Sequence, residues 1–267
     1  GIGAPGYPSY RQILKSLGIS PVDIVTNLEN KFQPTAKDVI SQNLDGLLVA
    51  SPSNPTGTML SKDELTDLID ASHSIGANFI SDEIYHGIQY EKKAVSALEV
   101  TDDCYVINSF SKFFSMTGWR VGWMVVPQDH IRVVERLAQN LFICSPHVSQ
   151  VAALEAMSCE DELTENLNIY SKNRQIIMDE LQRIGLQSFA PPDGAFYFYI
   201  DISKYSDDSL SFCNDILQEV GVAITPGVDF DPARGKTTIR ISYARSTDEI
   251  TEGINKLGDF MKKRGYF

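Results

Sequence analysis

This chain of 267 residues has few cysteines and histidines, no long apolar run and few positive charges, and each of these features excludes some functions. Its four cysteines and four histidines have neither the spacing of metal ligands nor the density of a disulfide framework. No apolar run approaches the roughly 18 residues of a membrane span, and the first residues lack the basic-then-apolar pattern of a signal peptide. We therefore expect no metal, no membrane partner and a reducing, cytoplasmic location.

Positive charge is also scarce. Lys and Arg number 23 against 35 Asp and Glu, which gives a formal net charge of -12. Such acidity argues against a nucleic-acid-binding or anionic-membrane surface. The hydrophobic content of 43% suits a soluble protein of one large or two modest domains.

The most informative stretch is Ser109 to Trp123, SFSKFFSMTGWRVGW. Lys112 lies among serines, and Arg120 follows eight positions later. Arginine binds phosphate oxygens in a bidentate manner, and hydroxyls add further donors. A lysine whose proton affinity is lowered by a nearby cation can condense with an aldehyde. Although S-x-S-K alone is more typical of a polar loop with a surface lysine, the combination predicts a site for pyridoxal 5'-phosphate, which carries an aldehyde, a phosphate and an electron-withdrawing ring.

Two apolar runs of strand length, 104–108 and 121–126, flank this lysine. The segment between them is too short for the helical crossover that parallel neighbours require. We therefore expect an antiparallel pair if the two strands are neighbours, with Arg120 near Lys112.

Three predicted strands end in polar groups suited to one cofactor. The run 46–50 leads into Asn54-Pro55-Thr56-Gly57, the run 77–81 leads into Asp82-Glu83-Ile84-Tyr85, and the run 104–108 leads into Lys112. A capping box at Ser61 and Glu64 predicts a helix between the first two strands. Open α/β sheets bind ligands at the carboxyl ends of their strands, so we expect the three groups at one edge.

An arginine in the apolar run Ile239-Arg240-Ile241-Ser242 needs an anion, because an unpaired guanidinium is costly to bury. A structural carboxylate is one candidate for this anion. The α-carboxylate of a substrate is the other.

Together these motifs resemble the class I pyridoxal-phosphate-dependent aminotransferases, of the aspartate aminotransferase-like fold type I. The matching segments are SFSK with SMTGWRVGW, NPTG, D-E-x-Y and R-I-S, in the family's order from Tyr7 to the C-terminal helix. The resemblance implies an α/β fold whose mostly parallel sheet is sandwiched by helices, with a smaller C-terminal α+β domain. It also implies that an N-terminal portion of the family's chain is absent from this sequence.

The resemblance assigns a role to each motif residue. Lys112 would form the aldimine with the cofactor, Asp82 would contact the ring nitrogen, and Tyr85 and Asn54 would contact the ring oxygen. The remaining assignments are Ser109 and Arg120 for the phosphate, Tyr7 for stacking on the ring, Arg240 for the substrate carboxylate and Gly194 for the border of the substrate pocket. We interpret Glu83 as a solvated carboxylate.

The implied activity is transfer of the amino group of an L-amino acid to a 2-oxo acid by a ping-pong mechanism in a homodimer. A carbon–sulfur β-lyase on the same fold would use the same residues. A non-catalytic effector-binding domain and an inactive truncated remnant are further alternatives.

The remaining chain predicts two domains, a large cofactor-binding domain over 1–160 and a small domain with a bridging helix over 161–267. Apolar stripes in 131–141 and 148–157 indicate helices that face the core, and 163–184 predicts a long helix. We expect no strand before a helix at 10–17 and a possible strand at 23–26. In the small domain we expect strands at 196–202, 222–225 and 238–243 and helices at 209–220 and 247–263.

Overall fold

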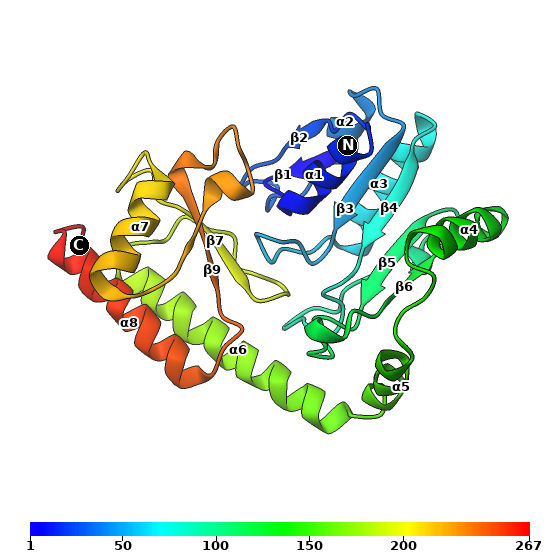
Figure 1. Ribbon diagram of the computed structural model, residues 1–267. Helices are drawn as coiled ribbons and strands as arrows, with labels where there is room; N and C mark the ends of the chain where they lie inside the picture. The colour runs from blue at the N-terminus through cyan, green and yellow to red at the C-terminus, as the bar shows by residue number, and fades with distance from the viewer.

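The computed structural model describes all 267 residues and consists of two lobes, each built on its own sheet (Figure 1). The first lobe has a six-stranded sheet with the order β2-β1-β3-β4-β5-β6, and the second has a three-stranded sheet with the order β7-β9-β8. The strands of the first lobe are β1 (Ile2–Ala4), β2 (Asp23–Val25), β3 (Gly46–Ala50), β4 (Asn78–Asp82), β5 (Tyr105–Ser109) and β6 (Gly122–Val125). Its helices are α1 (Pro8–Ser16), α2 (Ala36–Ile40), α3 (Lys62–Ser74), α4 (Ile131–Leu141) and α5 (His147–Ala156).

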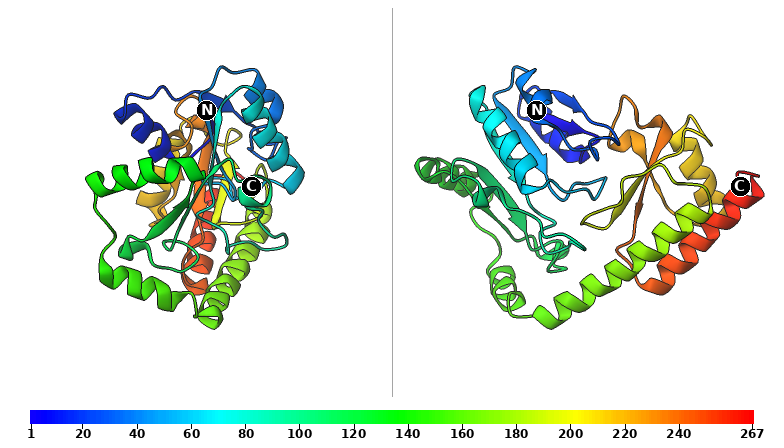
Figure 2. Two further views of the ribbon diagram at one scale, coloured as in Figure 1. Left: turned by 90° about the vertical axis from the view of Figure 1, so that its right-hand side faces the viewer. Right: turned by 180° about the vertical axis from the view of Figure 1, so that it is seen from behind.

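The second lobe is built from helix α6 and the elements that follow it. They are α6 (Glu160–Arg183), β7 (Tyr197–Asp201), α7 (Ser209–Val220), β8 (Thr225–Pro226), β9 (Thr238–Ser242) and α8 (Thr247–Lys263). Helices α6 and α8 lie side by side along this lobe in every view (Figure 2). The bounds of α7 and α8 confirm the predicted helices at 209–220 and 247–263.

The large sheet is parallel except at one edge. Strands β1 to β5 pair in parallel, whereas β6 runs antiparallel to β5 with Ser109 opposite Gly122. This pairing confirms the expected antiparallel neighbours around the lysine segment. Helix α3 begins at the predicted capping box, where Ser61 accepts from the Glu64 amide and Glu64 accepts from the Ser61 amide.

One core lies in each lobe. In the first, Leu47, Val49 and Phe79 of the sheet pack against Leu65 and Leu68 of α3. The core of the second lobe belongs to a cluster of 22 buried residues that we call the inner core, which also includes Tyr85 and Ile88 of the first lobe. Its members on β7, β9, α6 and α8 include Phe198, Ile200, Ile239, Ile177, Leu181, Ile254 and Leu257.

Two arginines connect the lobes. Arg234 donates from Nη2 to the Ala4 carbonyl at 2.6 Å and from Nη1 to the Thr26 carbonyl at 3.1 Å. Arg174, which lies on α6, donates from Nη1 to Glu91 at 2.8 Å. These contacts fix the second lobe against the edge of the first.

Two local predictions about the chain were wrong. The structure forms β1 at Ile2–Ala4, where no strand was expected, because three residues are too few to show a periodic pattern. The strand expected over 222–225 is reduced to Thr225–Pro226, because only these two residues pair with β9. The structure also contains α2 at Ala36–Ile40, for which the sequence analysis made no prediction.

The large apolar side chains of α4 and α5 do not face a core, contrary to the prediction, although Ala153 of α5 is buried with Phe110 and Met116. Leu137, Leu141 and Leu154 expose 58%, 71% and 73% of their surface. Helical spacing identifies the apolar face of a helix but not what covers it. We call the exposed apolar residues of β6, α4 and α5 and the turn after α4 the outer apolar surface; they are Trp123, Met124, Val125, Ile131, Val133, Leu137, Leu141, Phe142, Ile143, Val148, Val151 and Leu154.

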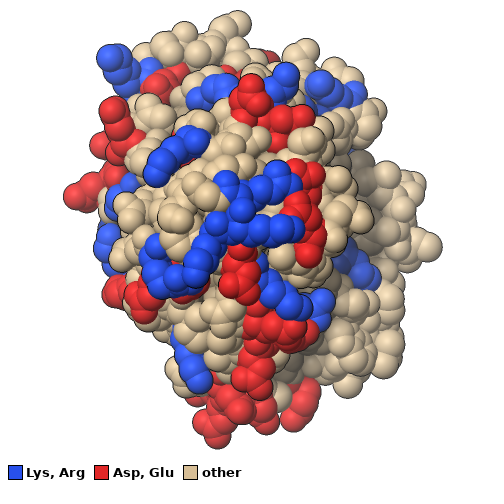
Figure 3. Space-filling model, turned by 90° about the vertical axis from the view of Figure 1, so that its left-hand side faces the viewer, with Lys and Arg blue, Asp and Glu red and all other residues tan.

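Charges of both signs share the face on the side of α7 and α8 (Figure 3). Lys263 pairs with Glu219 at 2.8 Å, and Arg264 pairs with Asp215 at 3.1 Å. Acidic and basic side chains are interspersed here and form no uniformly positive face. None of the helices combines the length and the hydropathy that a membrane crossing requires.

Candidate cofactor and substrate site

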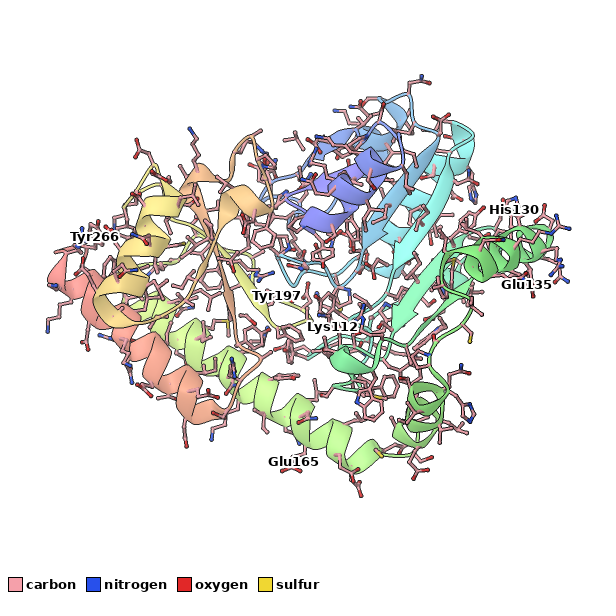
Figure 4. The ribbon with its side chains drawn as sticks, viewed as in Figure 1. Lys112, His130, Glu135, Glu165, Tyr197 and Tyr266 are labelled. Carbon is pink, nitrogen blue, oxygen red and sulfur yellow. The ribbon has the colours of Figure 1, made fainter.

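The ends of three adjacent parallel strands supply the centre of the site. Asn54 follows β3, Asp82 ends β4, and Lys112 follows β5. The strands pair with Ala50 opposite Asp82 and Asp82 opposite Ile107, so their carboxyl ends lie at the same edge. Lys112 lies between the two lobes, close to Tyr197 of β7 (Figure 4). The sequence analysis expected this convergence of strand ends.

Lys112 is partly buried against aromatic rings. Its Nζ lies 5.7 Å from the ring centroid of Tyr85 and 5.9 Å from that of Phe196. Burial lowers the pKa of Lys112, and the charges of Arg240 and Arg120 lower it further, against the opposing effects of Tyr7 and Asp82. A larger share of neutral amine is therefore present at a given pH than for an exposed lysine.

Asp82 is held by two donors. The Tyr10 hydroxyl donates to Oδ2, and the Ile84 amide donates to Oδ1 at 3.0 Å. Burial raises the pKa of Asp82, whereas the hydrogen bond from Tyr10 and that from Ile84 lower it. Tyr10 was not predicted as a site residue, although it lies only three positions after Tyr7. Its ring packs edge-on against that of Tyr7, with 5.4 Å between the ring centroids.

Asn54 and Tyr85 supply two further polar groups of the site. The Oδ1 atom of Asn54 accepts from Arg240 Nη1 at 2.9 Å, which leaves the Nδ2 donor free for a ligand. The Tyr85 hydroxyl lies 3.0 Å from that of Tyr197. Burial raises the pKa of Tyr85 well above its usual value, so the hydroxyl keeps its proton. Tyr197 lies on β7 and was not among the predicted site residues.

Ser109 and Arg120 lie on the two sides of the loop between β5 and β6. The Ser109 hydroxyl lies 2.9 Å from the Ser111 hydroxyl and accepts from the Ser111 amide at 3.0 Å. Arg120 is exposed, and its Nη1 donates to the Thr117 carbonyl at 3.0 Å. The structure records no direct bond between Ser109 and Arg120, but both present donors on the same loop as Lys112.

Arg240 enters the site from the second lobe. Its guanidinium is sandwiched between the rings of Tyr197 at 4.4 Å and Phe230 at 4.6 Å, and Nη2 donates to Thr225 at 3.3 Å. Its buried Nε has no hydrogen-bond partner. No carboxylate lies within ion-pair distance of Arg240. Because an unsatisfied buried donor is costly, this arrangement favours an external anion.

The other two predicted residues lie at the margins. Tyr7 immediately precedes α1 and exposes 43% of its surface. Gly194 packs tightly, since a Cβ there would lie 2.6 Å from the Ile88 carbonyl oxygen and 2.7 Å from Pro52 Cγ. Its amide donates to the Gly57 carbonyl at 2.8 Å. Gly194 therefore supports the loop around Asn54 by close backbone packing.

Glu83 was expected to be solvated, and this was wrong. It is only 3% exposed and accepts from Ser81 Oγ at 3.0 Å, Ser96 Oγ at 3.1 Å and the Ala97 amide at 2.8 Å. Ser96 and Ala97 come from a loop thirteen and fourteen residues away in the chain. Their approach to Glu83 is a tertiary contact that the local sequence does not reveal.

Comparison with known proteins agrees with this geometry. Residues 2–257 match the model of the family described as aminotransferase class I and II. The valine–pyruvate aminotransferase of Mycobacterium tuberculosis is 43% identical over 97% of this chain and 69% of its own length. A crystal structure of an aminotransferase from the same organism superposes with a TM-score of 0.95 at 42% identity, over 98% of this chain and 69% of that one.

Aspartate aminotransferase of Thermotoga maritima has the same fold, with a TM-score of 0.90 at 28% identity over 98% of this chain and 69% of that one. The second lobe and the antiparallel edge of the large sheet are thus features of a known architecture. The chain belongs to the class I aminotransferases and is a transaminase that depends on pyridoxal 5'-phosphate.

Proposed function

We propose that this chain transfers the amino group of an L-amino acid to a 2-oxo acid by a ping-pong mechanism in which Lys112 binds the cofactor covalently. The observation that carries the proposal is the meeting of Lys112, Asp82 and Asn54 at adjacent strand ends, opposite Arg240 with its unpaired buried Nε. An amine whose pKa is lowered by burial, a carboxylate and an anion receptor within one site suit this chemistry.

The residues present fit the cofactor. We assign Asp82 to the ring nitrogen, Asn54 and Tyr85 to the ring oxygen, Ser109 and Arg120 to the phosphate, and Tyr7 to the face of the ring. When bound, pyridoxal phosphate supplies an electron sink for the bond that breaks at the substrate Cα. The free Nδ2 of Asn54 and the buried carboxylate of Asp82 support this orientation.

Arg240 and Lys112 would act on the substrate itself. Arg240 binds the α-carboxylate through its unpaired Nε and its Nη groups, and so orients the Cα–H bond. The Lys112 amine would act as the base that takes the proton from the substrate Cα. The lowered pKa of Lys112 supports this role as a base.

The amino donor is proposed to be a neutral, aliphatic amino acid, with a small 2-oxo acid as acceptor. The support is the 43% identity to an enzyme named for valine and pyruvate. The aromatic rings of Tyr197 and Phe230, which pack on Arg240, also favour a neutral side chain.

A homodimer in the cytoplasm completes the proposal, with a large domain over 1–160 and a small domain over 161–267. The outer apolar surface supports the dimer, because exposed patches of this kind mark interaction sites. Four free cysteines support a reducing compartment. The six-stranded sheet within 1–160 and the three-stranded sheet within 161–267 support the division.

The test is an absorbance spectrum of the protein with pyridoxal phosphate before and after borohydride reduction. Wild type should gain a visible band, and reduction should fix the cofactor on the peptide that contains Lys112. Lys112→Ala should lack both, whereas Lys172→Ala, a change at an exposed lysine of α6, should behave as wild type.

Amino acids added one at a time should then bleach the band, with valine and alanine ahead of aspartate. Labelling of another lysine, or a folded wild type without a band, contradicts the proposal. Release of ammonia and pyruvate from cysteine conjugates, with no oxo-acid product from ordinary amino acids, would indicate a β-lyase instead.

A further inference from the structure

His86 immediately follows Tyr85, and the proposed function gives it no role. It closes the turn after β4, in which its amide donates to the Glu83 carbonyl at 2.9 Å. Its side chain is 19% exposed and lies between two acceptors. Nε2 is 3.0 Å from the Ser51 carbonyl oxygen, and Nδ1 is 3.4 Å from Oε2 of Glu83.

The contact with Ser51 shows which ring nitrogen of His86 carries a hydrogen. A backbone carbonyl can only accept, so Nε2 carries a hydrogen and donates it to Ser51. Glu83, on the other side of the ring, is itself held by Ser81, Ser96 and the Ala97 amide. The imidazole therefore donates to the Ser51 carbonyl on one side and lies 3.4 Å from the Glu83 carboxylate on the other.

Ser51 is the first residue of the loop that carries Asn54. Its amide donates to the Asp82 carbonyl at 3.3 Å, and its hydroxyl accepts from the Leu60 amide at 2.9 Å, which ties together the two ends of the loop. Asn54 lies three residues after Ser51, and Tyr85 lies one residue before His86. The His86–Ser51 bond thus joins the two segments that present the pair of groups proposed for the ring oxygen.

We infer that His86 is a positioning residue that sets the separation between Asn54 and Tyr85. This separation determines how tightly the two side chains bind the ring oxygen of the cofactor. The inference rests on the proposed function for the identity of that oxygen. Two donors that bind one atom depend on their relative placement, and the His86–Ser51 hydrogen bond fixes that placement.

The test compares two amide variants of His86. In His86→Gln the amide nitrogen can occupy the place of Nε2 and donate to Ser51, whereas the shorter side chain of His86→Asn falls short of it. Each apoprotein is titrated with pyridoxal phosphate and with the analogue that lacks the ring hydroxyl, and binding is followed by equilibrium dialysis. Melting temperatures check that both variants fold.

His86→Asn should bind pyridoxal phosphate about tenfold more weakly than wild type and the analogue with unchanged affinity. His86→Gln should remain within about threefold of wild type for both ligands. Equal weakening for the two ligands, or a Gln variant as weak as the Asn variant, overturns the inference, because neither follows from a lost bond to Ser51.

A second measurement does not need the cofactor. Amide hydrogen exchange of Ser53 and Gly57, whose N–H groups donate to the Thr58 and Ser53 carbonyls, reports how firmly the loop is held. Exchange should be faster in His86→Asn and unchanged in His86→Gln. If wild type binds no pyridoxal phosphate, the proposed function fails, and unchanged exchange in His86→Asn would separately overturn the positioning role.

Discussion

The inner core and the outer apolar surface use similar amphipathic helices with opposite results. On α6, Leu181 is fully buried beneath the small sheet, whereas on α4 the equivalent side chain of Leu141 is 71% exposed. Burial of a leucine contributes about 1.5–3 kcal/mol, so α6 gains a stabilisation that α4 lacks within this chain. The difference teaches that α4 and α5 carry apolar faces suited to a contact beyond the fold of a single copy.

The largest difference between the inner core and the outer apolar surface is expected when a leucine in each is replaced by alanine. We expect Leu181→Ala to lower the free energy of unfolding by about 2–5 kcal/mol, because it leaves a cavity in the inner core. Leu141→Ala should change it by less than about 0.5 kcal/mol at low protein concentration. Urea denaturation followed by circular dichroism measures both, and equal losses would contradict the distinction.

The inner core also borders the proposed substrate receptor. Arg240→Leu should lower kcat/KM about 10- to 150-fold, because charge-assisted hydrogen bonds to a carboxylate contribute about 1.5–3 kcal/mol. The spectrum with pyridoxal phosphate should persist. Arg245→Leu, at an exposed arginine near the start of α8, is the matched control. If both variants lose activity equally, Arg240 has no special part in substrate binding.

Charged residues introduced into the outer apolar surface should weaken self-association of the chain. The double change Leu137→Lys with Leu141→Lys, on one face of α4, should weaken self-association about tenfold, as expected for a loss of roughly 1.4 kcal/mol. Sedimentation equilibrium over a concentration series measures this. Gln139→Lys adds a charge on the same helix at an exposed polar position and should leave association unchanged. A monomeric wild type would refute the proposed interface.

The smallest expected effect concerns the loop that leads from Lys112 into β6. Arg120 helps to lower the pKa of Lys112, so Arg120→Gln should raise that pKa. Reaction with the aldehyde needs the neutral amine and should then require a higher pH. The pH dependence of the trapping rate with borohydride tests the direction, and the shift should shrink at high salt. A downward shift would contradict the assigned electrostatics.

Sequence patterns predicted those features that depend on neighbouring residues. The ends of β3, β4 and β5, the capping box of α3 and the bounds of α7 and α8 all follow from local periodicity and turn chemistry. The positions of Asn54, Asp82 and Lys112 at one sheet edge followed because parallel strands share their direction.

The features that were missed depend on contacts between distant segments. Tyr10 donates to Asp82 across 72 positions, and Tyr197 reaches Tyr85 across 112. Burial of Glu83 likewise requires the loop at Ser96. A periodic stripe on α4 could not distinguish a core from an interface, because both demand the same apolar residues.

Helix α6 is the long helix that leads from the first lobe into the second (Figure 1). Its 24 residues span about 36 Å at 1.5 Å per residue. A rotation of 5° at its first turn would displace its far end by about 3 Å, which equals the length of the Arg240–Asn54 hydrogen bond. The alignment of Arg240 with the cofactor edge therefore depends on the direction of α6, and the contacts of Arg174 and Arg234 hold the second lobe in this orientation.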